Sequence, residues 1–190
     1  MPCDRFLQRK TAVLSKLDKS SIGKWDKKIA SLCDKINKLS DFYTTSSCSG
    51  RIILMIQQEK KENDLFLRTW HEKVSFSELK MALNGLLKLK KIVKFKLEPP
   101  IIHVACRDLK KATWILEKAK YLGFKRSSIL TSDKNIFVEL NTSDRMEFPI
   151  LKGGKVLVGD EFLKLVVKMS HHKLESGWKK IKALEKKLES

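Results

Sequence analysis

The sequence predicts an α+β fold with a largely antiparallel sheet, helices at the N-terminus and a long C-terminal helix. Between residues 51 and 150, segments that alternate apolar and polar residues indicate strands, and segments of helical periodicity lie among them. These elements fall into two units, strand–strand–helix–strand followed by strand–helix–strands, an order typical of α+β domains. No Gly-x-Gly-x-x-Gly motif follows a strand, so a Rossmann-type nucleotide fold is not supported.

The length of 190 residues suits one sizeable domain, which we expect to span residues 1–190. Its expected parts are N-terminal helices at about 5–39, an α+β core at about 41–158 and a C-terminal helix at about 160–188. Ser20–Gly23 is expected to divide the N-terminal part into helices at 5–18 and 24–39, the second with Trp25 on its apolar stripe. The C-terminal helix is expected to be interrupted near Ser170–His172.

The central elements have recognisable boundaries. Ser75 and Glu78 fit a capping box for a helix that continues to about residue 90. Asp108 can cap a second helix that Gly123 ends. A charged turn is expected at 58–64 and a Gly-Gly turn at 152–155. The expected strands are 51–57, 65–70, 92–98, 101–107, 127–131, 135–141 and 145–150.

Residues 41–56 are the stretch most suggestive of a functional site. It contains an acid and two aromatics, then hydroxyl and thiol side chains, then Gly50, Arg51 and an apolar run. Because buried hydroxyls need partners, we expect the polar part to be a loop at the mouth of a buried strand. Backbone N–H groups and hydroxyls of such a loop can converge on an anion or polar ligand. A tight Ser/Gly turn without a ligand is the alternative.

The charge is strongly positive. Lys and Arg number 40 against 22 Asp and Glu, a formal net charge of +18. A field of that sign attracts polyanions, of which nucleic acid is the first candidate. The alternative is a thermophile's charged surface, but there Lys and Glu increase together, which is not the case here.

The cysteines, Cys3, Cys33, Cys48 and Cys106, have irregular spacings and no Cys-x-x-Cys pair. We therefore expect neither a metal site nor a disulfide framework. No apolar run reaches membrane-spanning length and no signal-peptide pattern is present. We expect a cytoplasmic protein that does not associate with membranes. No sequence pattern indicates a stable protein partner.

The strand at 101–107 carries the main catalytic candidate. Alternation puts Ile102, Val104 and Cys106 on a core face, and His103 and Arg107 on the other. We expect a ligand to lie across Ala105 between them. A solvated strand face is the alternative.

Aromatic and basic residues elsewhere suit nucleic acid. Trp70 and His71 stand at a strand end, where a ring can stack a base, although a buried Trp beside a turn is also consistent. Phe124, Lys125 and Arg126 suit a base plane or phosphate. Lysines between 88 and 96, Lys94 and Lys96 among them, are either a solvated face or a phosphate track.

Five segments, in this order, resemble the tRNA wybutosine-synthesising protein 3 family. The segment Thr45–Arg51 is the most specific of them, and Ser128 departs from the Gly expected at its position. The compact length resembles archaeal members. The five segments are Phe42–Ile52, Trp70–His71, Lys96–Val104, Gly123–Ser127 and Arg145–Ile150.

The resemblance implies a methyltransferase that uses S-adenosylmethionine to methylate N4 of a wyosine-type tricyclic base beside the anticodon of phenylalanine tRNA. His103 is then the candidate base, with Ser47 and Ser49 in the catalytic geometry. The residues expected to hold the cofactor are Thr45, Ser46, Ser47, Ser49, Gly50 and Arg51. The residues expected to contact tRNA are Tyr43, Trp70, His71, Lys94, Lys96, Arg107, Phe124, Lys125 and Arg126.

Two other functional classes fit parts of the sequence. A non-catalytic basic RNA-binding module would explain the charge and the aromatics without a cofactor. A scaffold that uses the long C-terminal helix to bind a partner is the third class. Cofactor binding separates the enzyme from both.

Overall fold

The computed structural model describes residues 4–15, 26–57, 65–132 and 135–188. The expected break at Ser20–Gly23, the indole of Trp25 and the expected turn at 58–64 lie outside these residues. All strand pairs in the described chain are antiparallel, which confirms the α+β class, and the strands form two sheets. Contacts divide the chain into unit 1 (1–49, 100–143 and 177–190) and unit 2 (50–99 and 144–176).

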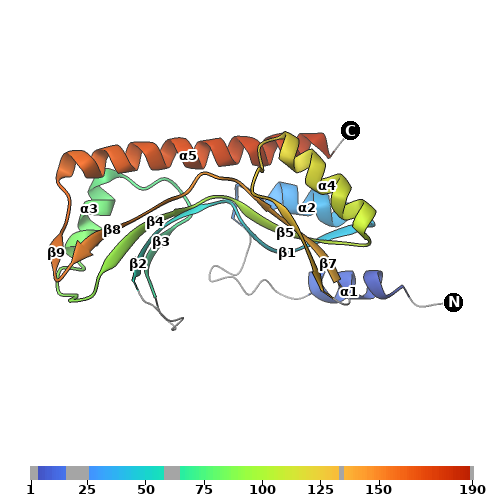
Figure 1. The fold of residues 1–190 in the computed structure, drawn as a ribbon, viewed down its shortest axis with the longest axis horizontal. Helices are drawn as coiled ribbons and strands as arrows, with labels where there is room; N and C mark the ends of the chain where they lie inside the picture. The colour runs from blue at the N-terminus through green and yellow to red at the C-terminus, as the bar shows by residue number, and fades with distance from the viewer. Residues whose placement is uncertain (1–3, 16–25, 58–64, 133–134, 189–190) are drawn as a thin grey trace. The chain divides into compact units, whose positions relative to one another are not determined.

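Unit 1 is built on a four-stranded sheet with helices on both faces (Figure 1). Its strands, in spatial order, are β1 (Phe42–Cys48), β5 (Ile101–Cys106), β7 (Asn135–Asn141) and β6 (Ser128–Ser132). One face packs on α2 (Ala30–Lys38), α4 (Leu109–Tyr121) and the end of α5 (Asp160–Lys187) to form the larger core. Helix α1 (Arg5–Leu14) covers part of the other face through Phe6, which contacts Tyr43 and Ala105.

The helix ends in unit 1 follow from local chemistry. Asp4 caps α1, and its carboxylate accepts hydrogen bonds from the N–H groups of Phe6 and Leu7. Asp108 caps α4 as expected, with Oδ1 2.8 Å from the N–H of Lys111. Gly123 follows α4 with φ of 97°, a conformation that favours glycine.

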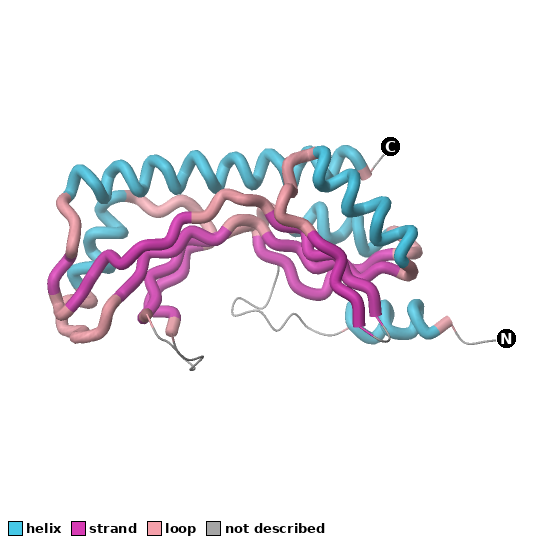
Figure 2. Tube along the Cα trace, in the orientation of Figure 1, coloured by secondary structure: helices cyan, strands magenta, loops and turns pink. Residues whose placement is uncertain are grey.

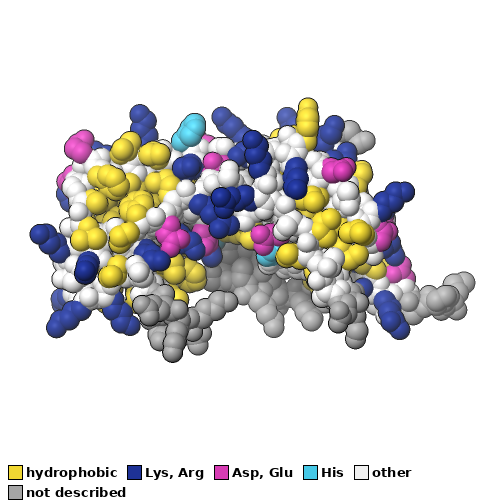
Figure 3. Space-filling model, in the orientation of Figure 1, with side chains coloured by type: hydrophobic (Ala, Val, Ile, Leu, Met, Phe, Trp, Pro, Cys, Tyr) yellow, Lys and Arg dark blue, Asp and Glu magenta, His cyan; other side chains and the backbone are white. Residues whose placement is uncertain are grey.

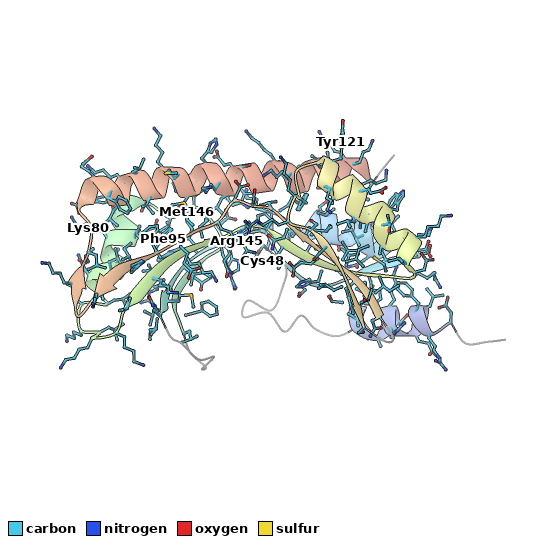
Figure 4. All side chains as sticks on the ribbon, viewed as in Figure 1. Cys48, Lys80, Phe95, Tyr121, Arg145 and Met146 are labelled. Atoms are coloured by element: carbon cyan, nitrogen blue, oxygen red, sulfur yellow. The ribbon has the colours of Figure 1, made fainter. Side chains whose placement is uncertain are left out.

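Unit 2 is built on a five-stranded sheet whose order is β3-β2-β4-β8-β9. Helix α3 (Phe76–Asn84) and the first part of α5 lie on one side of it (Figure 2). Buried Phe95 lies between the strands and these helices (Figure 4), and its ring stacks on Phe148 at 5.2 Å. The strands are β2 (Arg51–Ile56), β3 (Phe66–Trp70), β4 (Val93–Glu98), β8 (Met146–Lys152) and β9 (Lys155–Val156).

Helices α3 and α5 differ from expectation in their extent. The capping box of Ser75 and Glu78 is confirmed, but α3 ends at Asn84 because Gly85 and a series of turns follow it. Helix α5 is continuous from Asp160 to Lys187, so the expected break near Ser170–His172 is wrong. The imidazole of His171 does not disturb the helix, since its Nε2 is satisfied 2.8 Å from the carbonyl oxygen of Val74.

The polar stretch after Asp41 is strand β1, so the prediction of a loop is wrong, whereas the ligand contacts expected of these residues stay a prediction. Its residues pair antiparallel with β5, from Phe42 opposite Cys106 to Cys48 opposite Ile101. As an edge strand, β1 can bury Phe42, Tyr43 and Thr44 and still leave later hydroxyls in solvent. Backbone groups that pair in a strand point along the sheet, so residues 42–48 do not offer the converging N–H groups of a loop.

Candidate active site

The serines of β1 point to opposite faces of the unit 1 sheet. Ser46 pairs with His103 and shares its exposed face, whereas Ser47 pairs with Ile102 and turns toward the core. A bulge between Thr44 and Ser46 sets this register, and it leaves Thr45 exposed. Of the serines in this strand, Ser46 is therefore the one that meets the candidate base.

Ser46, His103 and Glu139 form a continuous set of side chains across three strands. Oγ of Ser46 is 2.5 Å from Nδ1 of His103, and Nε2 of the same ring is 2.9 Å from Oε2 of Glu139. Both His103 and Glu139 side chains are 29% exposed. The carboxylate can only accept, so Nε2 carries the proton and Nδ1 accepts from the serine hydroxyl. A hydroxyl, an imidazole and a carboxylate in this order form a proton acceptor that opens to solvent at Ser46.

A cavity of about 400 Å³ lies on the same face of the sheet. Ala105 lines it, two residues along β5 from His103, and Cys106 and Ile136 contribute as well. The side chains that give it chemical character are Phe6, Arg9, Tyr43, Arg107, Ser132 and Asn135. Its size falls within the range of small-molecule sites, roughly 300–1,000 Å³.

Arg107 ties α1 to the sheet. Its Nε donates to Asp41 and its Nη1 to Asp4, each at 2.7 Å, and its guanidinium lies 4.8 Å from the ring centre of Phe6. Hydrogen bonding to Arg107 lowers the pKa of the Asp4 carboxyl, and hydrogen bonds from Lys111 and then Arg107 lower that of Asp41. Two carboxylates thus engage the guanidinium of Arg107, and its expected contact with tRNA stays a prediction.

Ser47 and Ser49 lie away from the His103 face. The buried hydroxyl of Ser47 stands beside the thiol of Cys33, whose pKa burial raises to about 11. Ser49 is fully buried, and its N–H and hydroxyl donate to Asp26 at 2.8 and 3.0 Å. Gly50 begins unit 2 with φ of 100° and is buried. The hydrogen bonds of Ser49 to Asp26 thus anchor the chain just after β1.

Two aromatic residues expected to stack a base are inside the protein. Tyr43 is 4% exposed under Phe6, and Phe124 is fully buried in the core of unit 1, so neither ring presents a face to tRNA. The two residues that follow Phe124, which are Lys125 and Arg126, are exposed. Residues 122–127 form the turns that connect α4 to β6.

The basic candidates in unit 2 are paired with acids. Arg51 and Lys96 both contact Glu98, at 2.7 and 2.8 Å, and Lys94 contacts Glu147 at 2.9 Å. Burial acts to raise the pKa of Glu98, but hydrogen bonds from Lys96 and Arg51 outweigh it and the pKa is lowered.

Trp70 ends β3 half-buried, and His71 follows it in unit 2. Neither residue belongs to the unit that contains Ser46 and His103.

Glu139 was missed by the sequence reasoning, although a signal existed. In β7, buried Val138 and Leu140 flank it, so strand alternation places its carboxylate on the outer face. What the sequence could not supply was the register that sets Glu139 opposite His103.

Comparison with known families decides the assignment. The model of the family described as Methyltransferase TYW3 matches residues 8–190. This chain is a member of that family. The membership confirms the resemblance seen in the five sequence segments, and it makes the chain a methyltransferase of the TYW3 type.

Relatives of this family member are alike over most of their length. A protein of Archaeoglobus fulgidus is 39% identical over 88% of this chain and 84% of its own, and one of Methanocaldococcus jannaschii is 35% identical over 90% of each. Both are named tRNA(Phe) 7-((3-amino-3-carboxypropyl)-4-demethylwyosine(37)-N(4))-methyltransferase.

Solved structures share the fold of this family member. The PH1069 protein of Pyrococcus horikoshii has a TM-score of 0.87 at 31% identity, over 96% of this chain and 95% of its own. A hypothetical protein of Aeropyrum pernix has a TM-score of 0.74 at 25% identity, over 86% of this chain and 97% of its own.

In the described part of this chain, no helix is both long enough and apolar enough to cross a membrane.

Proposed function

We propose that this chain methylates N4 of the demethylwyosine-type base of tRNA(Phe), the reaction for which its relatives are named, with S-adenosylmethionine as methyl donor. Family membership and the formal charge of +18 support a tRNA methyltransferase. The single observation that carries the catalytic part is the set Ser46–His103–Glu139, a proton acceptor on an exposed sheet face.

The reaction asks for a proton acceptor and for alignment. S-Adenosylmethionine, when bound, would supply an electrophilic methyl group on a sulfonium, whose sulfur would leave as a neutral thioether. The ring nitrogen loses its proton as its bond to the methyl carbon forms. In our proposal Ser46 Oγ accepts that proton and passes its own to Nδ1 of His103. Glu139 then stabilises the resulting imidazolium and holds its orientation.

The residues around the 400 Å³ cavity fit a molecule of the donor's chemistry. Phe6 and Tyr43, which are packed on each other and nearly buried, form its apolar wall. Arg9 offers a guanidinium for a carboxylate, and Ser132 and Asn135 offer polar groups for ribose hydroxyls. We assign the donor to this cavity, because it lies beside Ala105 on the face that His103 shares.

We propose that both units serve this one activity, since the family match spans residues 8–190 and so includes both. The cytoplasm, where the tRNA substrate is found, is the compartment that we propose for it.

The test is incubation of the purified chain with donor labelled in its methyl group and tRNA from a strain that lacks this protein. We expect label in the wyosine-type base of tRNA(Phe), and no label with tRNA from a strain that has the enzyme. Tight tRNA binding with neither methyl transfer nor donor binding would support the non-catalytic RNA-binding module instead.

A further inference from the structure

The outer side of α4 carries alternating basic and aromatic residues that the proposed chemistry does not use. Lys110, Trp114, Lys118 and Tyr121 follow one another at intervals of four, four and three residues, so they share one side of the helix. We call these four residues the α4 stripe. The inner side of α4 is buried through Ala112, Ile115 and Ala119, so the stripe is not needed for the core.

Both rings of the stripe reach solvent. Trp114 is 40% exposed and Tyr121 is 86% exposed, and Tyr121 projects from the end of α4 in Figure 4. Tyr121 is the most exposed of the large apolar or aromatic side chains that the structure describes. Seven residues of helix separate the rings by about 10 Å along the axis, so each can meet a different base.

Trp114 is held in a defined orientation at the edge of a small cavity. Its indole stacks on buried Phe42 with ring centres 5.6 Å apart, and Nζ of Lys118 lies 4.7 Å from its centre. The cavity, of about 260 Å³, is lined by residues 39–42, Lys110, Lys111 and Trp114. It is smaller than most sites for whole cofactors, and its mixture of ring surface and ammonium groups suits a single base with its phosphate.

The charge around the stripe is mainly positive. Charged side chains surround apolar surface in the region of α4 (Figure 3). Lys111 is paired with Asp41 at 2.8 Å, whereas Lys110 is exposed, and exposed Lys125 and Arg126 follow the helix. Exposed Glu117 is the acid within the helix on this side.

We propose that the α4 stripe binds unpaired nucleotides of the tRNA substrate. Bases stack on the rings of Trp114 and Tyr121, and the ammonium groups of Lys110 and Lys118 meet the phosphates between them. Aromatic side chains spaced by basic ones are the arrangement that single-stranded nucleic acid favours. This inference rests on the proposed function, and it adds the surface that holds an unpaired segment while the modified base reaches His103.

The test compares two double variants with the wild type in tRNA(Phe) binding across a series of salt concentrations. Trp114→Leu with Tyr121→Leu removes both rings and no charge. We expect its Kd to rise about tenfold or more with an unchanged salt slope, since stacking on each ring contributes independently of salt. Trp114→Phe with Tyr121→Phe keeps two rings, and its Kd should stay within about threefold of the wild-type value.

Two measurements separate this inference from the proposed function. Tyr121→Leu alone replaces a side chain that is 86% exposed, so a folded variant is assured even if Trp114→Leu loosens its contact with Phe42. Its Kd should rise at least about threefold. If the leucine variants bind tRNA as tightly as the wild type, and the wild type transfers methyl groups, the proposal that the α4 stripe binds tRNA is wrong and the proposed function stands. A wild type that transfers no methyl group would overturn the proposed function.

Discussion

The hydroxyl oxygen of Ser46 lies 2.5 Å from Nδ1 of His103, while the adjacent hydroxyl of Ser47 is buried on the opposite face of the same strand. Two chemically identical neighbours thus occupy a solvent-facing and a core-facing position. Alanine variants of these two serines therefore form a matched pair, because they remove the same hydroxyl from opposite faces of one strand.

Ser46→Ala should slow methyl transfer about tenfold or more, because it removes the hydroxyl through which a proton reaches His103. Ser47→Ala should leave the rate within about twofold and change the free energy of unfolding by about 1 kcal/mol or less. Single-turnover transfer and thermal melting of both variants check this. Equal loss of rate in the two would show that the strand matters for activity only through its integrity.

Strand alternation predicted correctly which side chains share a face of β5, but the neighbouring segment β1 was not predicted to be a strand. Period-two spacing predicts His103 and Arg107 on one side; His103 lies on the outer face of β5, and Arg107, just after the strand, lines the cavity beside Ala105. The polar run in β1 was read as a loop because hydroxyls are costly to bury. That cost does not arise on an edge strand, where Thr45 and Ser46 remain in solvent.

Salt dependence should distinguish exposed from paired basic residues. Lys125→Gln with Arg126→Gln should flatten the slope of log Kd for tRNA against log salt by about two units if both meet phosphates. Lys94→Gln with Lys96→Gln should have a smaller effect, since these ammonium groups are already paired with Glu147 and Glu98. A larger change in the second pair would indicate that the tRNA phosphates contact Lys94 and Lys96 of unit 2 instead.

The ion pairs around Asp41 should make the stability of the fold depend on pH in the acidic range. Hydrogen bonds from Lys111 and Arg107 lower the pKa of Asp41 below its ordinary value of 3.8. Its stabilising contribution is therefore complete above that value and is lost as the pH falls through the lowered folded-state pKa. Asp41→Asn should melt at a lower temperature than the wild type at neutral pH. The difference should shrink below pH 3.8, and one that stayed constant would argue against this linkage.

Gly177 should be intolerant of a methyl group despite lying within α5. In a helix interior, Gly→Ala normally stabilises by roughly 1 kcal/mol. Here an added Cβ would stand 2.7 Å from Cγ and Cδ of Pro100, a rigid ring that cannot withdraw easily. Gly177→Ala should therefore lower the melting temperature, whereas Lys179→Ala, at an exposed position of the same helix, should change it little. An increase for Gly177→Ala would show that the ring moves aside.

Features that depend on distant parts of the chain were the ones that sequence reasoning could not reach. The capping residues Ser75 and Asp108 were predicted because a cap is local to its helix. The partnership of His103 with Glu139 depends on register between strands 36 positions apart in sequence. The engagement of Arg107 by Asp4 depends on where α1 docks, which no local pattern specifies.

The rate of a single turnover of methyl transfer by His103→Ala, with tRNA and labelled donor both saturating, tests the account most directly. We predict a rate at least about 100-fold below that of the wild type, with the Kd values for donor and tRNA within about twofold, because the imidazole acts on the proton of the acceptor nitrogen and binds neither molecule. Glu139→Gln should fall between the two. A His103→Ala rate equal to that of the wild type would contradict the assignment of Ser46, His103 and Glu139 as the proton acceptor.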